Sequence, residues 1–133
     1  MRFEERPEPK IVEPTDAVLR LSATCVCGSD LWPYRGIGGS SEPTPMGHEY
    51  CGIVEEVGRG VRSIKAGQFV VGSFFASDNT CAVCRAGYQS RCVHLEPIAA
   101  GGAQAPRLRV PLADGTLVPT PAASPSPELA KRL

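Results

Sequence analysis

The chain has 133 residues, 42% of them hydrophobic, which suits one domain with a modest core and leaves no room for a second full domain. Fourteen basic residues balance fourteen acidic ones without a long block of either sign, which argues against a nucleic-acid or anionic-membrane partner. The first ten residues alternate charges and prolines, and no window suits a signal peptide or a membrane span. We therefore expect a cytoplasmic protein.

Thirteen prolines and fourteen glycines punctuate the sequence and exclude a long helix before the last ten positions, so strands and loops should dominate. Alternating apolar and polar residues predict a half-buried strand over 17–27 that ends at Cys27. Other strand-like runs, bounded by Gly, Pro or Asp, span 51–57, 69–75 and 108–112. Regular short strands favour a small barrel or sandwich.

The end of the chain differs in composition from the rest. Residues 119–127 are rich in Ala and Pro and resemble a linker. Ser126 and Pro127 then predict the start of a short helix. We expect one domain over residues 1–121, followed by a linker or tail over 122–133.

Three of the six cysteines cluster in the pattern D-x2-C-x2-C-x7-C, formed by Asp78, Cys81, Cys84 and Cys92. Cytosolic thiols stay reduced or bind a metal ion, and a CxxC turn lets two thiolates converge on one tetrahedral ion. A thioredoxin-like dithiol is the alternative, but that motif normally opens a helix after a strand. The pattern favours structural zinc, with either Asp78 or His94 as the fourth ligand.

A second candidate group combines Cys27 with His48 and Glu49, which lie beside predicted strand ends. Open metal sites are usually built at such positions on a rigid scaffold. A histidine alone is more often a satisfied polar residue than a ligand. When a cysteine, a histidine and an adjacent carboxylate occur together, metal binding becomes about as probable as a purely structural role.

The motif G-H-E-x2-G-x5-G-x2-V, from Gly47 to Val61, resembles the zinc signature of medium-chain alcohol dehydrogenases, and Cys27-Gly-Ser-Asp matches their upstream ligand motif. The cysteine cluster is a third match. The resemblance covers residues 3–121 and implies a mainly β, GroES-like small barrel with a zinc-binding lobe and few short helices. Members with Asp at the first structural-zinc position are the most similar, which favours Asp78 over His94.

The resemblance also implies roles for single residues. Cys27 and His48 would be ligands of a catalytic zinc, and Glu49 would be a neighbouring carboxylate able to approach the metal. Ser29 would relay the substrate proton. Asp30 would hydrogen-bond His48 and fix its tautomer.

The same resemblance implies oxidation of a small-molecule alcohol to an aldehyde or ketone, with hydride transfer to NAD or NADP. Trp32 would then line the substrate cleft. The sequence contains no GxGxxG turn of a Rossmann domain, because the nearest run, at 36–41, ends in Ser and follows no strand. The family's third catalytic-zinc ligand is also missing.

We therefore expect the N-terminal portion of a catalytic domain, cut off before its cofactor domain and inactive alone. Self-association into a homo-oligomer would be compatible with such a portion. The alternative is a non-catalytic, zinc-stabilised barrel that acts as a binding module.

Three further residues carry no site assignment. Cys25 occupies an odd position in the alternating run, as Leu19 and Leu21 do, and so lies on the same face of the predicted strand. It is interpreted as a small buried hydrophobic residue. Cys51 begins the strand that follows the GHE motif. Asp114 lies in Ala-Asp-Gly-Thr, which is typical of a tight turn rather than a ligand position.

Overall fold

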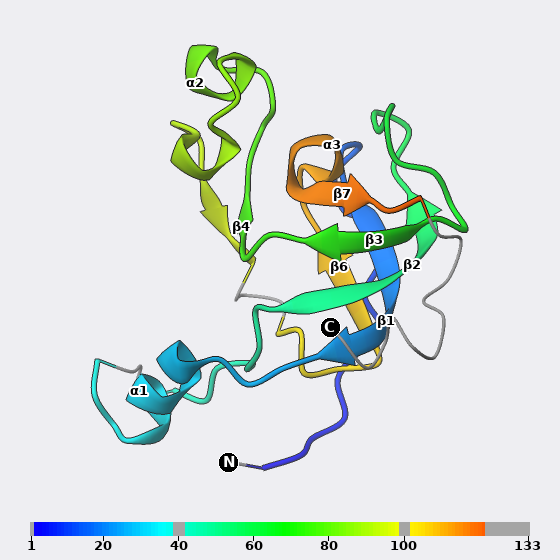
Figure 1. Cartoon of the computed structure of the whole chain (residues 1–133). Helices are drawn as coiled ribbons and strands as arrows, with labels where there is room; N and C mark the ends of the chain where they lie inside the picture. The colour runs from blue at the N-terminus through cyan, green and yellow to red at the C-terminus, as the bar shows by residue number, and fades with distance from the viewer. Residues whose placement is uncertain (1, 39–41, 99–101, 122–133) are drawn as a thin grey trace.

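The computed structural model describes residues 2–38, 42–98 and 102–121, so the tail at 122–133 with its expected helix lies outside the described residues. The centre of the fold is an antiparallel five-stranded sheet in the order β6-β1-β2-β3-β7 (Figure 1). Its strands are β1 Ala17–Thr24, β2 Tyr50–Val57, β3 Phe69–Gly72, β6 Arg107–Val110 and β7 Leu117–Pro119.

Two smaller parts project from this sheet (Figure 1). The upper one is a lobe built on the two-stranded ribbon of β4 (Phe75–Ala76) and β5 (Glu96–Pro97). It contains the helical turns α2 (Ala82–Arg85) and η2 (Gln89–Arg91). The lower one holds η1 (Gly28–Asp30) and α1 (Leu31–Tyr34), while α3 (Ala113–Thr116) precedes β7.

No helix among the described residues exceeds four residues, and none could cross a membrane. The expectation of a mainly β chain with few short helices is confirmed, and the described residues contain no Rossmann unit. The expected strands at 51–57 and 108–112 match β2 and β6, and the run at 69–75 splits into β3 and β4. β6 and β7 are unpaired edges of the described sheet, so hydrogen bonding does not close it into a barrel.

The first strand ends earlier than the alternating pattern predicts. β1 stops at Thr24, paired with Tyr50 at the start of β2, and no strand among the described residues pairs with the chain beyond that point. The Cys27 N–H instead donates to the Asp30 side chain at 2.9 Å, and Cys27 caps η1. Cys27 therefore lies in a turn three residues past the strand, rather than at its last position.

The core lies on the inner face of the central strands. Leu19 pairs with Val54 on one side and with Leu108 on the other, and each of these side chains is at most 1% exposed. Burial of one such side chain stabilises a fold by roughly 1.5–3 kcal/mol. These three side chains thus form one apolar layer that joins β1, β2 and β6.

A tyrosine secures the start of β2. Tyr50 pairs with Gly72 of β3, and a Cβ at Gly72 would lie 2.2 Å from the Tyr50 ring, so only glycine fits beneath it. The buried hydroxyl donates to the Ser73 carbonyl at 3.2 Å. Burial raises the pKa of Tyr50, which keeps the phenol neutral. This packing fixes the strand immediately after His48 and Glu49.

A fully buried carboxylate ties the N-terminal segment to the sheet. Asp16 accepts the amides of Val12 and Glu13 at 2.9 and 2.7 Å, and the Arg109 guanidinium at 2.6 and 3.1 Å. Burial pushes the pKa of Asp16 upward, but the hydrogen bonds from Arg109 and the two amides outweigh it and hold the pKa below its ordinary value. The carboxylate therefore stays ionised and anchors the chain just before β1.

Substituting Asp16 with Ala should lower the free energy of unfolding by about 2–4 kcal/mol at pH 7, because two amides and a guanidinium lose their acceptor. The depressed folded-state pKa means that this stability is present above the unfolded pKa and is lost as the pH falls through the folded value. Urea denaturation from pH 7 down to pH 3, at constant zinc concentration, should therefore show the difference from wild type shrinking below about pH 4.

The matched control is Glu8→Ala, which removes an exposed partner of Arg107 and should leave stability nearly unchanged. Equal stability of wild type and Asp16→Ala at pH 7 would contradict the anchoring role.

Candidate metal centres

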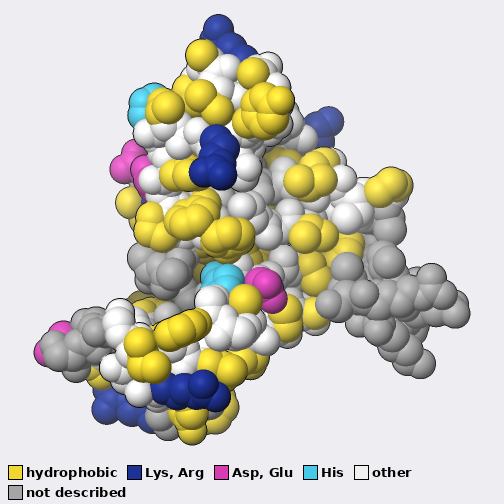
Figure 2. Space-filling model, turned by 60° about the vertical axis from the view of Figure 1, so that its left-hand side comes forward, with side chains coloured by type: hydrophobic (Ala, Val, Ile, Leu, Met, Phe, Trp, Pro, Cys, Tyr) yellow, Lys and Arg dark blue, Asp and Glu magenta, His cyan; other side chains and the backbone are white. Residues whose placement is uncertain are grey.

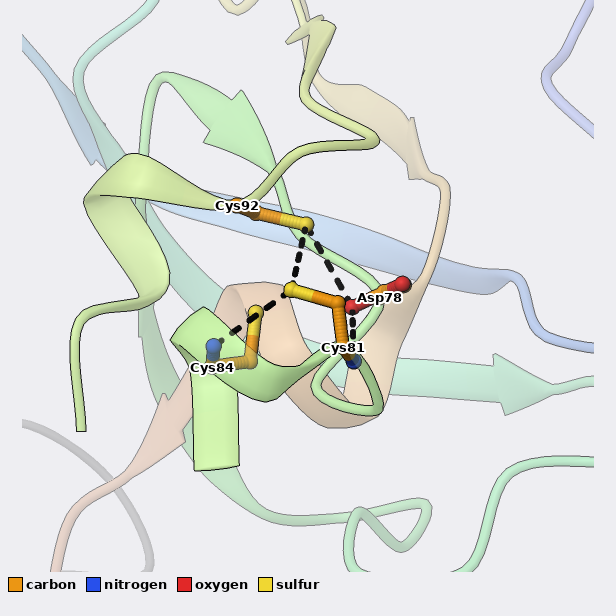
Figure 3. A group of neighbouring side chains, drawn as sticks. All are labelled: Asp78, Cys81, Cys84 and Cys92. Atoms are coloured by element: carbon orange, nitrogen blue, oxygen red, sulfur yellow. Dashed lines mark hydrogen bonds between the residues drawn. The ribbon is translucent and has the colours of Figure 1, made fainter. Parts of the chain in front are cut away.

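The lobe brings four potential ligands together. One ligand atom each from Asp78, Cys81, Cys84 and Cys92 lies within 4.8 Å of all the others. In Figure 3 the three sulfurs and one carboxylate oxygen face a common centre. The sulfurs of Cys81 and Cys92 are 4.0 Å apart, close to the roughly 3.8 Å that two Zn–S bonds of a tetrahedral site impose. The donor set of three thiols and one carboxylate therefore fits Zn²⁺, and we call this group the zinc knuckle.

Local backbone geometry explains the convergence. The Asp78 Oδ1 accepts the amides of Thr80 and Cys81 at 2.9 and 3.2 Å, and Asn79 adopts a positive φ of 56°. Cys81 then caps α2, where its sulfur accepts the Cys84 amide at 3.4 Å. A turn stabilised by its own aspartate thus aims the first three donors inward.

The thiols of the knuckle differ in acidity. Amides, chiefly those of Val93 and Cys84, lower the pKa of Cys81 to about 7. Burial and then the thiol and carboxylate neighbours raise the pKa of Cys84 to about 12. Several groups that can carry negative charge share a small volume here, and a bound cation would favour the thiolate form of each thiol.

The second group lies between the ends of β1 and β2. Ligand atoms of Cys27, His48 and Glu49 lie within 4.8 Å of one another. The Ser29 hydroxyl donates to the Cys27 sulfur at 3.3 Å and is 3.2 Å from the His48 Nε2. Hydrogen bonds from the Ser29 hydroxyl and amide, followed by His48, lower the pKa of Cys27. The thiolate, which is the metal-binding form, is thereby favoured.

The histidine of this group is held from two sides. Asp30, which is 7% exposed, places one carboxylate oxygen 3.3 Å from the His48 Nδ1 while its other oxygen accepts the Cys27 amide. The Phe74 ring meets the imidazole edge-on at 6.0 Å between centroids. With Nδ1–H donating to Asp30, Nε2 keeps its lone pair for a ligand. The contact between Asp30 and His48 that the resemblance implies is thus present.

A loop far along the chain supports both halves of this group. The Gln104 amide donates to the Met46 carbonyl at 3.0 Å, and its side chain donates to the Cys25 carbonyl at 3.2 Å. Gly47 has φ of 96°, and a Cβ there would lie 2.7 Å from Gln104, so this turn requires glycine. Sequence reasoning missed Gln104, since no local pattern marks a residue that bridges two distant loops.

Cys25 contradicts its sequence-based interpretation. It is exposed rather than buried, and its thiol donates to the Glu49 Oε2 at 2.7 Å. That hydrogen bond raises the pKa of the Cys25 thiol. The alternation that suggested burial ends with β1 at Thr24, which leaves Cys25 in the following turn.

Cys51 and Asp114 lie outside both groups. Cys51 is 5% exposed in β2, and burial raises its pKa. Asp114 lies in the single turn of α3 and accepts the amides of Arg62 and Ser63. Neither residue belongs to a ligand cluster within the described part of the chain.

Apolar side chains border the second group. A surface pocket of about 150 Å³ is lined by Gly28, which follows Cys27 in the chain, and by Leu31, Trp32, Arg35 and Ile37. Figure 2 shows one histidine and one acidic side chain at the surface between two regions rich in apolar side chains. Trp32 is 59% exposed and Phe74 is 53% exposed, so both can contact a ligand with an apolar body.

Residues 13–122 match the alcohol dehydrogenase GroES-like domain family. The chain is 44% identical to zinc-type alcohol dehydrogenase B of Aspergillus flavus, over 89% of this chain and 28% of that protein. It is 43% identical to the medium chain reductase/dehydrogenase ucsI of Acremonium sp, over 90% of this chain and 42% of that protein. Alcohol dehydrogenase TADH from Thermus sp. ATN1 superimposes with a TM-score of 0.80 at 34% identity, covering 90% of this chain and 36% of that one. The chain thus spans less than half the length of these relatives.

Replacing Cys81 with Ser should lower the thermal midpoint by roughly 10 °C or more and remove one zinc per chain, because a structural metal contributes directly to folding free energy. Metal analysis with differential scanning calorimetry measures both. Cys51→Ser, which lies outside either group, is the control for loss of a thiol. Full zinc content and an unchanged midpoint in Cys81→Ser would exclude the knuckle as a structural site.

Replacing Asp30 with Ala should weaken metal binding at Cys27 and His48 by about 10–100-fold, because the imidazole loses the partner that orients it. Competition with a chelator, read separately for the two metal equivalents, measures this change. The knuckle equivalent should keep its affinity and serves as the internal control. Equal weakening at both sites would indicate a general folding defect instead.

Proposed function

The chain belongs to the zinc-dependent medium-chain alcohol dehydrogenase family, and from that premise we propose that it forms the zinc-carrying catalytic portion of an NAD(P)-dependent enzyme. The substrate would be a small alcohol, oxidised to an aldehyde or ketone. The observation that carries this proposal is the convergence of Cys27, His48 and Glu49 with the Ser29 hydroxyl, beside an apolar pocket.

The donor set at Cys27, His48 and Glu49 fits a catalytic metal. Catalytic zinc sites keep three protein ligands and one open position, and alcohol dehydrogenases with two cysteines and one histidine are themselves an example. Among the described residues the third donor beside Cys27 and His48 is the Glu49 carboxylate. Zinc bound there supplies Lewis-acid activation, which lowers the pKa of an alcohol toward neutrality.

The chain's own residues would divide the remaining work. Ser29, within hydrogen-bond distance of both the Cys27 sulfur and the His48 ring, would relay the alcohol proton, passing on its own hydroxyl proton as it takes up that of the substrate. Asp30 would keep the imidazole oriented, and the Cys25 thiol would hold one oxygen of Glu49. Trp32 and Phe74 would exclude water and pack against the substrate's apolar body.

The nicotinamide cofactor would be bound by a nucleotide-binding domain that the 133 residues do not contain, since the sequence has no GxGxxG turn. We therefore expect the isolated chain to bind metal without turning over alcohols. Turnover of an alcohol with NAD or NADP by this chain alone would contradict that expectation.

A second candidate function is a zinc-stabilised, non-catalytic binding module. The observation that favours it is the difference between the two metal groups. The knuckle offers four ligand atoms and is complete, whereas the Cys27 group offers three. Such a module would hold one structural zinc per chain and would not respond to alcohols.

Cobalt substitution separates these functions in the chain itself. The purified chain should take up two equivalents of Co²⁺, and small alcohols or carbonyl compounds should shift the visible absorption of only one of them, because only that ion has an open position. Cys27→Ser should lose that equivalent and its response, whereas Ser29→Ala should keep the metal. A single equivalent that no alcohol perturbs would favour the non-catalytic module.

A further inference from the structure

We propose that His94 is a positioning residue of the zinc knuckle, which holds Asp78 so that a single carboxylate oxygen faces the metal. The inference rests on the knuckle binding zinc, as proposed above. Spacing along the chain leaves Asp78 and His94 as competing fourth ligands, and the geometry instead assigns them different and complementary roles.

The two oxygens of Asp78 have different surroundings. Oδ1 lies 3.3 Å from the Cys92 sulfur and accepts the amides of Thr80 and Cys81. Oδ2 lies 2.5 Å from the His94 Nδ1. Figure 3 shows one oxygen turned toward the sulfurs and the other turned away from them. Oδ1 is thus the inner oxygen, on the side of the sulfurs, and Oδ2 is the outer oxygen, on the side of His94.

His94 itself lies outside the ligand set. Its side chain is 66% exposed, against 13% for Asp78, and it belongs to no cluster of converging ligand atoms in the described residues. Its Nδ1 is already engaged by Asp78. Its amide donates to the Cys92 sulfur at 3.3 Å, so the knuckle fixes the backbone that carries the ring. The ring is therefore placed on the outer side of Asp78.

This arrangement has a physical consequence for metal binding. A carboxylate can bind a metal through one oxygen or through both, and a tetrahedral site with three thiolates has room for one. A donor that holds Oδ2 disfavours rotation of the carboxylate and two-oxygen binding. The imidazole N–H also offsets part of the excess negative charge of three thiolates and a carboxylate around a divalent ion. His94 should therefore raise zinc affinity without contacting zinc.

The test measures zinc affinity of the knuckle by chelator competition in a Cys27→Ser background, which removes the second site. His94→Ala should weaken zinc binding by about tenfold or more. His94→Asn should recover most of the affinity, because its side-chain amide can donate from nearly the position of Nδ1. The visible spectrum of the Co²⁺ form should change in His94→Ala and return in His94→Asn.

Asp78→Cys provides the matched control. A thiolate ligand has no outer oxygen, so adding His94→Ala to Asp78→Cys should leave zinc affinity unchanged. An equal loss with and without Asp78→Cys would show that His94 only stabilises the loop, which overturns the proposal.

Two other results would also overturn it. Asp78→Ala that still binds zinc, with a cobalt spectrum typical of three sulfurs and one nitrogen, would make His94 the ligand. Unchanged affinity in His94→Ala would remove the positioning role while leaving the knuckle intact. Absence of zinc from the Cys27→Ser chain would instead overturn the knuckle, and this inference with it.

Discussion

The antiparallel pairing of β1 with β2 is the constraint on which the second metal group depends. Its last pair joins Thr24 to Tyr50, so the residues that follow β1 and those that precede β2 leave the sheet at the same place. The Thr24 hydroxyl donates to the Glu49 carbonyl at 2.9 Å and extends the contact by one residue. A register shift of one residue would turn the side chains of either strand to the opposite face. Cys27 and His48 meet because this register is held.

The two metal groups are built in different ways. The knuckle comes from one short stretch of chain, and its own turn at Asp78 and the cap at Cys81 aim the donors inward. The Cys27 group needs two strand ends and the distant Gln104 loop. All four donors of the knuckle therefore lie within residues 78–92, whereas those of the other group are brought together by the pairing of β1 with β2.

The segment from β3 to β4 links the two groups. The chain from β3 to β4 places Phe74 against His48, and the ring of the next residue, Phe75, lies tilted against the Phe74 ring at 4.6 Å between centroids. Four positions after Phe74 the same segment supplies Asp78 to the knuckle. Zinc bound in the lobe would thus restrain the segment that carries Phe74, the aromatic side chain beside the proposed catalytic site. A metal in the lobe would in this way support the proposed catalytic site without contacting it.

The sequence by itself determined the features that depend on residues close together in the chain. The C-x2-C-x7-C spacing identified the three cysteines that converge in the lobe, because a tight turn limits where neighbouring thiols can lie, and it left Asp78 and His94 as candidates for the fourth position. Strand-like runs bounded by Gly, Pro or Asp located β2, β3 and β6 within a few residues, since those turn residues mark where a strand ends. The motifs around Cys27 and His48 indicated the family.

Only the tertiary structure decided the rest. The end of β1 depends on where β2 begins, which the alternating pattern does not contain. The pattern therefore predicted a strand that is too long and a buried Cys25, whereas Cys25 is exposed. Spacing could not separate Asp78 from His94, because it restricts the backbone and leaves the direction of each side chain open. The folded lobe turns one oxygen of Asp78 toward the sulfurs and the other toward His94. Those directions result from hydrogen bonds between residues that are brought together only when the chain folds.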